Sequence, residues 1–320
     1  MYMFKYILKR IGLMLLTFFI IMTVSFILIK LLPIVVDVSI GKDADILEAQ
    51  IVARGYRDPI LKQYFVYLYR IIVKGDWGIG INMPEFRNQP VWDSFVKSLP
   101  PTVLINVYST LFAVPIGLLL GIYAALRKNK WQDHTVSTVV MIFISVPSYI
   151  TAFLVQYFLC FKLKLFDLTM NSGYEYFTWS MFKSMLPAVI AMSFGSICGY
   201  ARFTRAELTE VLTSDYLLLA RTKGLTKGQS ITRHALRNAM VPIFPSIIGE
   251  FVAVLSGSLI IERIFSIPGV GRLYLNAINS LDYDFFMMLS AFYTFVGLAA
   301  GIVVDISYGF IDPRIRMGAK

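Results

Sequence analysis

The residue types that carry out chemistry in enzymes are few in this sequence and widely separated. Cys160 and Cys198 both fall in apolar stretches and lack the CxxC spacing of a metal site or a redox pair. The histidines are His134 and His234, and the sequence contains neither an HExxH zinc motif nor a GxxxxGK[ST] phosphate loop. We therefore expect no catalytic residue, no metal site and no cofactor bound by this chain.

Glu250 is the one acidic residue inside a long apolar stretch. A carboxylate at membrane depth usually faces a bundle interior or an aqueous cavity. Two interpretations stay open: Glu250 lines a transport pathway, or it makes a buried hydrogen bond between helices. An intramembrane protease would need a second catalytic group beside it. A self-sufficient secondary transporter, in which Glu250 would carry protons, is an alternative that would need inverted repeats, and none is evident in the sequence.

Membrane spans are the elements that would position Glu250. Of the 320 residues, 57% are hydrophobic and 16% are charged, whereas an ordinary soluble domain has about 25% charged residues. Besides Glu250, the predicted spans contain one charge, Lys30, which lies near a helix end and is expected to reach the head groups. Six stretches are apolar and long enough to cross about 30 Å of hydrocarbon as helices: residues 11–32, 102–126, 135–161, 185–201, 241–261 and 285–304. The predicted fold class is all-α integral membrane with six transmembrane helices.

Lysine and arginine accumulate on one side of these predicted spans. They cluster before the first span, between the second and third, between the fourth and fifth, and after the sixth. Because short cytoplasmic loops are enriched in these residues, both termini are predicted to be cytoplasmic. The same rule accounts for the net charge of +10, so the expected partner is the lipid bilayer and not nucleic acid.

The chain divides by composition into three segments: residues 1–33, an N-terminal tail and first helix; residues 34–101, an external loop domain; and residues 102–320, a membrane core with a cytoplasmic loop at 204–240. The external loop is of mixed polarity and contains an amphipathic run of aromatic and aliphatic residues. This run predicts a helix over residues 59–74 and hence a folded external element.

The cytoplasmic loop between the fourth and fifth predicted spans has strong local signals. Ser214 or Asp215 can cap a short helix that ends at Gly224, a residue suited to a left-handed helix end. Thr226 and Gln229 have the spacing of a capping box, which predicts a second helix. The short helix carries apolar residues 216–220, and two explanations stay open: a partner protein covers them, or they pack only on the chain's own spans.

Several motifs in this order carry a family resemblance. Residues 219–225 read LARTKGL, and HALRNA follows at 234–239. These strings resemble the coupling motif of binding-protein-dependent ABC importer permeases, in the B-type subunit of the dipeptide, oligopeptide and nickel branch. The resemblance continues with GDWG at 75–78, LPPT at 99–102, ERIFSIPGVGRL at 262–273 and DPRIR at 312–316.

The resemblance implies a type I ABC importer transmembrane domain whose cytoplasmic coupling helix sits in a cleft of an ATPase subunit. The residues that would couple this chain to the ATPase are Asp215, Leu219, Ala220, Arg221, Lys223, Gly224, Arg237 and Asn238. Glu250 remains the candidate pathway residue.

The resemblance also implies the partners and the location. These are a homologous second permease, two cytoplasmic ATPase subunits on which ATP and Mg act, and an external solute-binding protein, all at a bacterial cell membrane. The implied function is import of oligopeptides or dipeptides, and import of a nickel or other metal chelate is the alternative within the same family.

Overall fold

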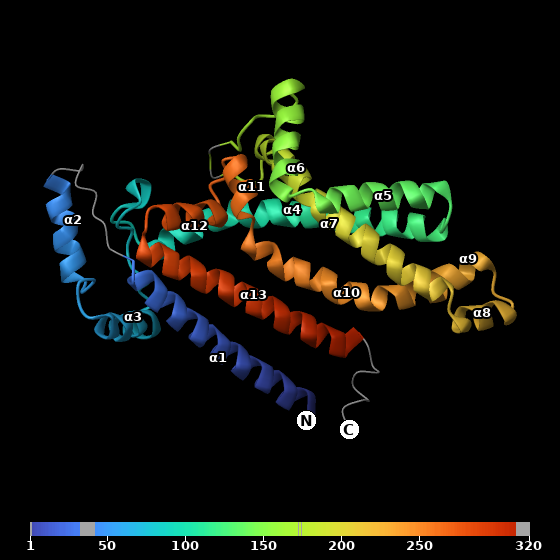
Figure 1. Cartoon of the computed structure of the whole chain (residues 1–320), viewed down its shortest axis with the longest axis horizontal. Helices are drawn as coiled ribbons and strands as arrows, with labels where there is room; N and C mark the ends of the chain where they lie inside the picture. The colour runs from blue at the N-terminus through green and yellow to red at the C-terminus, as the bar shows by residue number, and fades with distance from the viewer. Residues whose placement is uncertain (1, 33–41, 172, 174, 312–320) are drawn as a thin grey trace. The chain divides into compact units, whose positions relative to one another are not determined.

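The computed structural model describes residues 2–32, 42–171, 173 and 175–311, and its regular secondary structure is helical (Figure 1). Isolated bridges pair Ile79 with Pro90 and Gly80 with Arg87. Residues 33–41 of the predicted external loop and the DPRIR motif at 312–316 lie outside the described residues.

The α-helices are α1 (Tyr2–Lys30), α2 (Lys42–Ala53), α3 (Ile60–Lys74), α4 (Val91–Leu126), α5 (Trp131–Ser145), α6 (Ser148–Val155), α7 (Trp179–Leu212), α8 (Asp215–Thr222), α9 (Lys227–Ser230), α10 (Leu236–Ala253), α11 (Leu259–Ile264), α12 (Val270–Asn279) and α13 (Tyr283–Ile311). Shorter 3-10 helices are η2 (Pro84–Phe86) and η5 (Val254–Ser256), and π-helices are η3 (Gln156–Lys162) and η4 (Ile231–Ala235).

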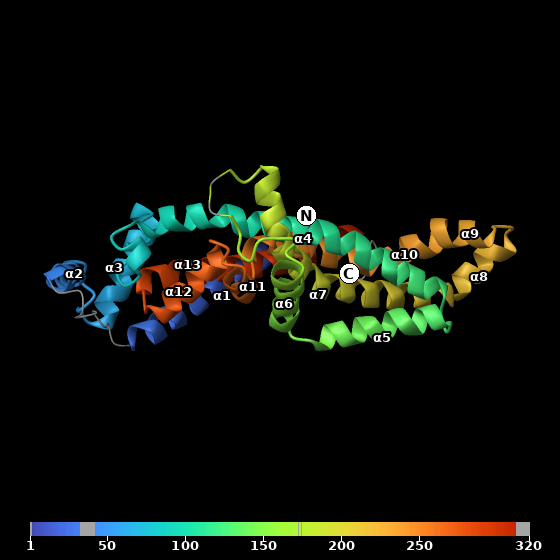
Figure 2. The same ribbon diagram turned by 90° about the horizontal axis from the view of Figure 1, so that it is seen from above.

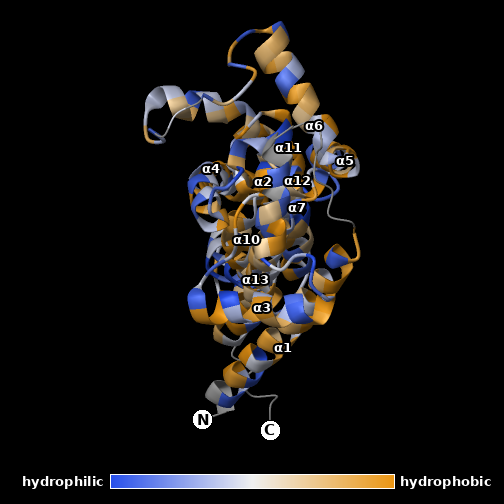
Figure 3. Cartoon of the chain, turned by 90° about the vertical axis from the view of Figure 1, so that its left-hand side faces the viewer, coloured by the Kyte–Doolittle hydropathy of each residue, from blue (hydrophilic) through white to orange (hydrophobic). Residues whose placement is uncertain are grey.

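Long apolar helices match most of the predicted spans. Among the described residues, five helices are long and apolar enough to cross a membrane, and the pair formed by residues 131–145 and 148–162 makes a sixth if it is one bent span. Hydrophobic residues predominate along α1 (Figure 3). The predicted spans at 11–32, 102–126, 185–201 and 285–304 are therefore confirmed as parts of α1, α4, α7 and α13.

Two predicted spans are interrupted, which the sequence analysis did not anticipate. The span at 135–161 bends by 102° between α5 and α6 (Figure 1). Pro147 explains the bend, because a residue before proline is driven out of the helical region, and Val146 is extended at φ −81° and ψ 125°. The span at 241–261 ends as an α-helix at Ala253, and Gly257 at φ 64° separates it from α11.

The chain divides into two compact units. The first comprises Met1–Thr102 and Pro268–Leu298, and the second comprises Val103–Ile267 and Ala299–Lys320. Helices α4 and α13 contribute to both. The first unit thus joins the predicted external loop with a segment that the sequence places about 200 residues later.

Two acidic side chains close to the start of α13 organise the loop of the first unit. The Asp282 carboxylate accepts hydrogen bonds from the backbone N–H groups of Ile81 (2.7 Å), Asn82 (2.8 Å) and Met83 (3.4 Å). Burial outweighs these donors and raises the pKa of Asp282 to about 6. Asp284 accepts from the Tyr56 hydroxyl and from the Ile79 N–H.

The GDWG string at 75–78 is a structural element of this unit. Gly75 ends α3 in the left-handed conformation at φ 63°, and Asp76 accepts a 2.8 Å hydrogen bond from the Gly78 N–H. Gly78 has φ 99°, and a Cβ at this position would lie 1.8 Å from Oδ2 of Asp284. Only glycine therefore lets the loop approach the buried carboxylate so closely.

The expectation that Lys30 reaches the head groups is wrong. Its Nζ lies over the rings of Tyr56 (4.2 Å), Tyr283 (4.8 Å) and Phe26 (5.7 Å) inside the first unit. These cation–π contacts supply favourable electrostatics for an ammonium group removed from water. The difference arises because the residues that surround Lys30 come from distant parts of the sequence.

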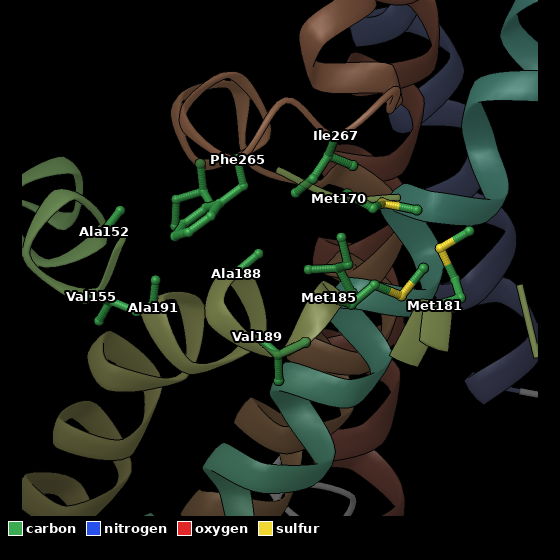
Figure 4. Close-up of a cluster of buried hydrophobic side chains, with 12 residues drawn as sticks. Ala152, Val155, Met170, Met181, Met185, Ala188, Val189, Ala191, Phe265 and Ile267 are labelled. Atoms are coloured by element: carbon green, nitrogen blue, oxygen red, sulfur yellow. The ribbon is translucent and has the colours of Figure 1, made fainter. Parts of the chain in front are cut away.

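Helix α7 is the centre of the second unit. Its residues Met181, Met185, Ala188 and Val189 pack in a cluster of buried side chains with Phe265 and Ile267 (Figure 4). On α4, a Cβ added to Gly117 would lie 2.8 Å from the Ile197 carbonyl, and one added to Gly121 would lie 2.6 Å from the Ala201 carbonyl. This GxxxG pair allows α4 and α7 to approach closely, as small residues do between membrane helices.

Candidate coupling surface and intramembrane cavity

The short cytoplasmic helix predicted from the sequence is α8, and with α9 it lies at the far end of α7 and α10 (Figures 1 and 2). Ser214 precedes it in an extended conformation, but its hydroxyl donates to the Val211 carbonyl (2.6 Å) and does not cap α8. Asp215 occupies the first turn, where the helix dipole stabilises a negative charge.

The inner face of α8 joins it to both neighbouring spans. Leu217 is 1% exposed, and it packs in one cluster with Leu208 of α7, Ala235 of η4 and Ala239 of α10. Ala220 is also buried on this face. The cluster therefore joins α8 to α7 and to the start of α10 by close packing.

The outer face of α8 is apolar and uncovered within the described residues. Leu218 is 63% exposed, Leu219 is 56% exposed and Tyr216 is 41% exposed. Exposed leucines at adjacent positions on a short helix are unusual on a surface that faces water alone. The explanation that the apolar run at 216–220 packs on the chain's own spans therefore holds for one face of α8, and cover of the other face by a partner protein stays a prediction.

Residues that follow α8 fix the geometry of the loop. Gly224 has φ 92°, as predicted for a left-handed stop, and a Cβ built there meets nothing within 4 Å. The predicted capping box is confirmed, because the Gln229 N–H donates to the Thr226 hydroxyl (3.3 Å) and the Thr226 N–H donates to Oε1 of Gln229 (3.1 Å). Backbone conformation alone therefore demands glycine at 224.

The other predicted coupling residues lie on the exposed surface. Arg221 and Lys223 follow the outer face of α8, and Arg237 and Asn238 lie exposed in the first turn of α10. Of the residues named from the sequence, Ala220 alone is buried. Arg221, Lys223 and Arg237 are thus exposed cations in the segment that is predicted to couple the chain to an ATPase.

An ion pair that sequence reasoning missed joins α5 to α7 near this loop. The Asp133 carboxylate is 1% exposed and accepts from both Nε (2.5 Å) and Nη2 (2.8 Å) of Arg205. It also accepts from the Asn129 N–H (3.0 Å). The two residues are 72 positions apart, so no local sequence pattern predicts the pair.

A cavity of about 620 Å³ opens among the predicted spans of the second unit, and its lining contains both polar and apolar residues. Its lining comes from α4, α7 and the segment from α10 to Gly257, and the polar side chains in that lining are Asn106, Ser109, Thr110, Ser196, Tyr200, Ser246, Glu250 and Ser256. Glu250 is the one charged residue in this lining. An ionisable side chain that faces a cavity at membrane depth is typical of a solute pathway.

The Glu250 carboxylate is held in place by α7. The Ser196 hydroxyl donates to Oε1 of Glu250 at 2.6 Å, and the Tyr200 side chain interacts with the same carboxylate. Glu250 thus makes a hydrogen bond between α10 and α7, as one of the two interpretations expects. It also lines a cavity, as the pathway interpretation requires. The described residues contain no group of three or more histidine, cysteine or acidic side chains able to hold a metal ion.

Comparison with known proteins places this arrangement in a family. Residues 117–317 match the family of binding-protein-dependent transport system inner membrane components. Over 98% of its length and the whole of the relative, the chain is 35% identical to the dipeptide transport system permease protein DppB of Lactococcus lactis. It is 34% identical to DppB of Bacillus subtilis and 32% identical to the oligopeptide transport system permease protein OppB of Salmonella typhimurium, again over nearly full length.

Solved structures agree at the level of the fold. The chain superimposes on an amino acid ABC transporter with histidines at a TM-score of 0.50 and 18% identity, covering 68% of this chain and 94% of that one. An inward-facing MetNI methionine ABC transporter gives a TM-score of 0.51 at 17% identity, covering 68% and 97%. The chain belongs to the family of binding-protein-dependent transport system inner membrane components.

Proposed function

We propose that this chain is a permease subunit of an ATP-driven peptide importer. The observation that carries the proposal is the full-length similarity to dipeptide transport permeases at 34% and 35% identity. The chain supplies part of the membrane pathway and does not hydrolyse ATP.

The transporter would contain a homologous second permease and two ATPase subunits, which bind ATP and Mg on the cytoplasmic side. An external solute-binding protein would deliver the peptide. The family supports this composition, because its description names dependence on a binding protein. The chain would cross a bacterial cell membrane several times with both termini in the cytoplasm.

Coupling to the ATPase would run through α8. The exposed Leu218 and Leu219 would enter an apolar cleft of the ATPase, while Leu217 ties the helix to α7 and α10. ATP-driven closure of the ATPase pair would then tilt these two spans and switch the pathway between outward-facing and inward-facing states.

The pathway would run past the cavity that Glu250 lines. Import of a metal chelate by the same scheme remains the alternative substrate, and a secondary transporter remains the alternative mechanism. The peptide permeases among the relatives favour the peptide, and a cytoplasmic apolar face on α8 has no role in a secondary transporter.

The test is ATP-dependent uptake of labelled dipeptides and of a nickel chelate by proteoliposomes that contain the assembled complex. The variant is Leu218→Ala with Leu219→Ala. Its matched control is Leu163→Ala with Leu165→Ala, because these leucines are 57% and 53% exposed and lie outside the cytoplasmic loop. We expect the first pair to abolish most peptide uptake and the control pair to leave it unchanged.

Each alternative outcome has a clear meaning. Uptake of the nickel chelate without peptide uptake would show that the substrate is a metal chelate and not a peptide. Uptake that persists without ATP would contradict the importer mechanism itself. Equal effects of the two leucine pairs, with the complex still assembled, would contradict the coupling role of α8.

A further inference from the structure

Helix α3 of the first unit exposes its apolar face, whereas a helix that lies in water exposes its polar face. Its exposed face consists of large apolar side chains: Leu61 (74% exposed), Phe65 (67%), Val66 (42%), Tyr69 (53%), Ile72 (76%) and Val73 (63%). Lys62, the remaining exposed residue along this face, pairs with Asp58 at 2.9 Å. An external helix in water would present the opposite pattern.

Polar side chains of α3 point into the protein instead. The Gln63 amide donates to the carbonyls of Tyr56 (3.0 Å) and Asp58 (2.6 Å). Arg70 bonds to Asp76 (3.0 Å), and its side chain is 17% exposed. The donors of Gln63 and Arg70 are thus bound by residues 56–76 of the same unit, and the apolar face of α3 points outward among the described residues.

Contacts with α1 fix the depth of α3 relative to the membrane. The Tyr64 hydroxyl lies 2.6 Å from the Thr23 hydroxyl, and the rings of Tyr64 and Tyr67 pack at 5.3 and 5.1 Å from the ring of Phe26. Figure 1 shows α3 beside the C-terminal end of α1. Thr23 precedes Lys30 by seven residues, which is about 10 Å along a helix.

The span length shows where Thr23 lies in the bilayer. The segment Lys5–Lys30 has 26 residues, which at 1.5 Å per residue is about 39 Å. It exceeds about 30 Å of hydrocarbon by about 9 Å. Even if all of the excess projects at the Lys30 end, Thr23 lies at the edge of the hydrocarbon. If the excess lies at the other end, Thr23 lies well within it.

We propose that α3 is an interfacial helix that lies in the leaflet where α1 ends and turns its apolar face toward lipid acyl chains. The apolar face continues the surface of α1, where Phe19 is 51% exposed and Leu28 is 60% exposed. Amphipathic helices settle about 5–10 Å into the boundary between head groups and acyl chains, which is the depth that the contact with Thr23 sets. The occupant of this face is lipid.

The predicted external element would therefore be attached to the membrane surface through α3. Because α3 also contributes Arg70 and Gln63 to the loop around Asp76 and Asp58, the element is held at the membrane surface. Its interaction with lipid is independent of which solute is transported.

The test is nitroxide accessibility in the full-length chain, co-expressed with its transporter partners and reconstituted in phospholipid bilayers. Cys160 and Cys198 are first replaced by Ser. Single labels are then placed with Phe65→Cys and Ile72→Cys. Phe19→Cys on α1 is the lipid-facing reference, and Glu85→Cys, an exposed position of the same unit, is the water-facing reference. Relaxation is measured with molecular oxygen, which partitions into lipid, and with water-soluble chromium oxalate.

We expect the oxygen-to-chromium accessibility ratio at Phe65 and Ile72 to approach the ratio at Phe19 and to exceed the ratio at Glu85 several-fold. A ratio equal to that of Glu85 would overturn the proposal and place α3 in water. Low accessibility to both agents would also overturn it, because a partner protein would then cover the face.

Discussion

The carboxylate of Glu250 is the single charge in the lining of the intramembrane cavity and is oriented by Ser196 on α7. A peptide carries an ammonium group at its amino end, and a carboxylate attracts it more strongly at membrane depth than in water. The hydrogen bond orients the side chain, while the charge acts on the solute. These two roles can be separated by substitution.

Glu250→Gln removes the charge and keeps an acceptor for the Ser196 hydroxyl. We expect peptide uptake to fall about tenfold, which corresponds to a loss of about 1.4 kcal/mol of attraction in the pathway. Ser196→Ala is the control: it removes the hydrogen bond, keeps the charge, and should change uptake much less. Unchanged rate and unchanged specificity in Glu250→Gln would contradict a role for this carboxylate in the pathway.

Gly78 and Gly75 form a second informative pair of residues. Both have positive φ, but a Cβ meets Asp284 at Gly78 and meets nothing within 4 Å at Gly75. Gly75→Ala should cost about 1–2 kcal/mol of backbone strain. Gly78→Ala adds a collision that overpacks a buried site, at a further cost of about 1–3 kcal/mol. Thermal unfolding in detergent measures both, and equal losses would show that the loop moves away from Asp284 without cost.

At the scale of the element, the features that the sequence predicted best are those set by residues a few positions apart. The bounds of α3 and α8, the left-handed Gly224 and the capping box of Thr226 with Gln229 all follow from patterns within a few residues, and the structure has each of them. The bend at Pro147 and the break at Gly257 also had local signals, which the apolar run around each residue obscured.

Contacts between elements could not be predicted in the same way. The inward position of Lys30 and the acceptors Asp282 and Asp284 depend on partners about 200 residues away. At the candidate site, exposure of Leu218 and Leu219 and burial of Ala220 required the position of α8 against α7 and α10. One signal between elements was readable, because the GxxxG spacing of Gly117 and Gly121 is typical of close helix pairs.

The ion pair between Asp133 and Arg205 makes a prediction about the packing of α5 on α7. Asp133→Asn leaves a guanidinium without its counter-charge, and because the Arg205 side chain is 33% exposed we expect a loss of about 1–3 kcal/mol, below that of a fully buried pair. The control is the surface pair of Arg57 and Glu48, with side chains 47% and 41% exposed, where Arg57→Gln should cost less than about 1 kcal/mol. Similar losses for both variants in thermal unfolding would contradict a special role for the buried pair.

At the scale of the whole molecule, an even number of membrane crossings would put both ends on one side. Five straight spans and one bent span give that number if α5 and the segment after it cross together. The bent pair is therefore the element on which the topology depends.

This topology is tested by labelling single cysteines in intact cells with a membrane-impermeant maleimide. Lys9→Cys should react only after permeabilisation, and Gln89→Cys should react in intact cells, because the positive residues of the N-terminus mark the cytoplasmic side. Asn238→Cys at the start of α10 serves as a second cytoplasmic position. Reaction of Lys9→Cys in intact cells would show that the N-terminus is external and would contradict the proposed orientation.

The dependence of residues 56–83 on Asp282 and Asp284 also sets an order for biosynthesis. The loop that contains Tyr56, Gly78 and Ile81 leaves the ribosome long before its acceptors, which are 201 residues further along for Ile81 and 228 for Tyr56. The intervening spans are therefore synthesised before the N–H groups of Ile79, Ile81 and Asn82 can reach these carboxylates. A chain released before residue 282 would lack both acceptors, so the first unit can be completed only after translation has reached the start of α13.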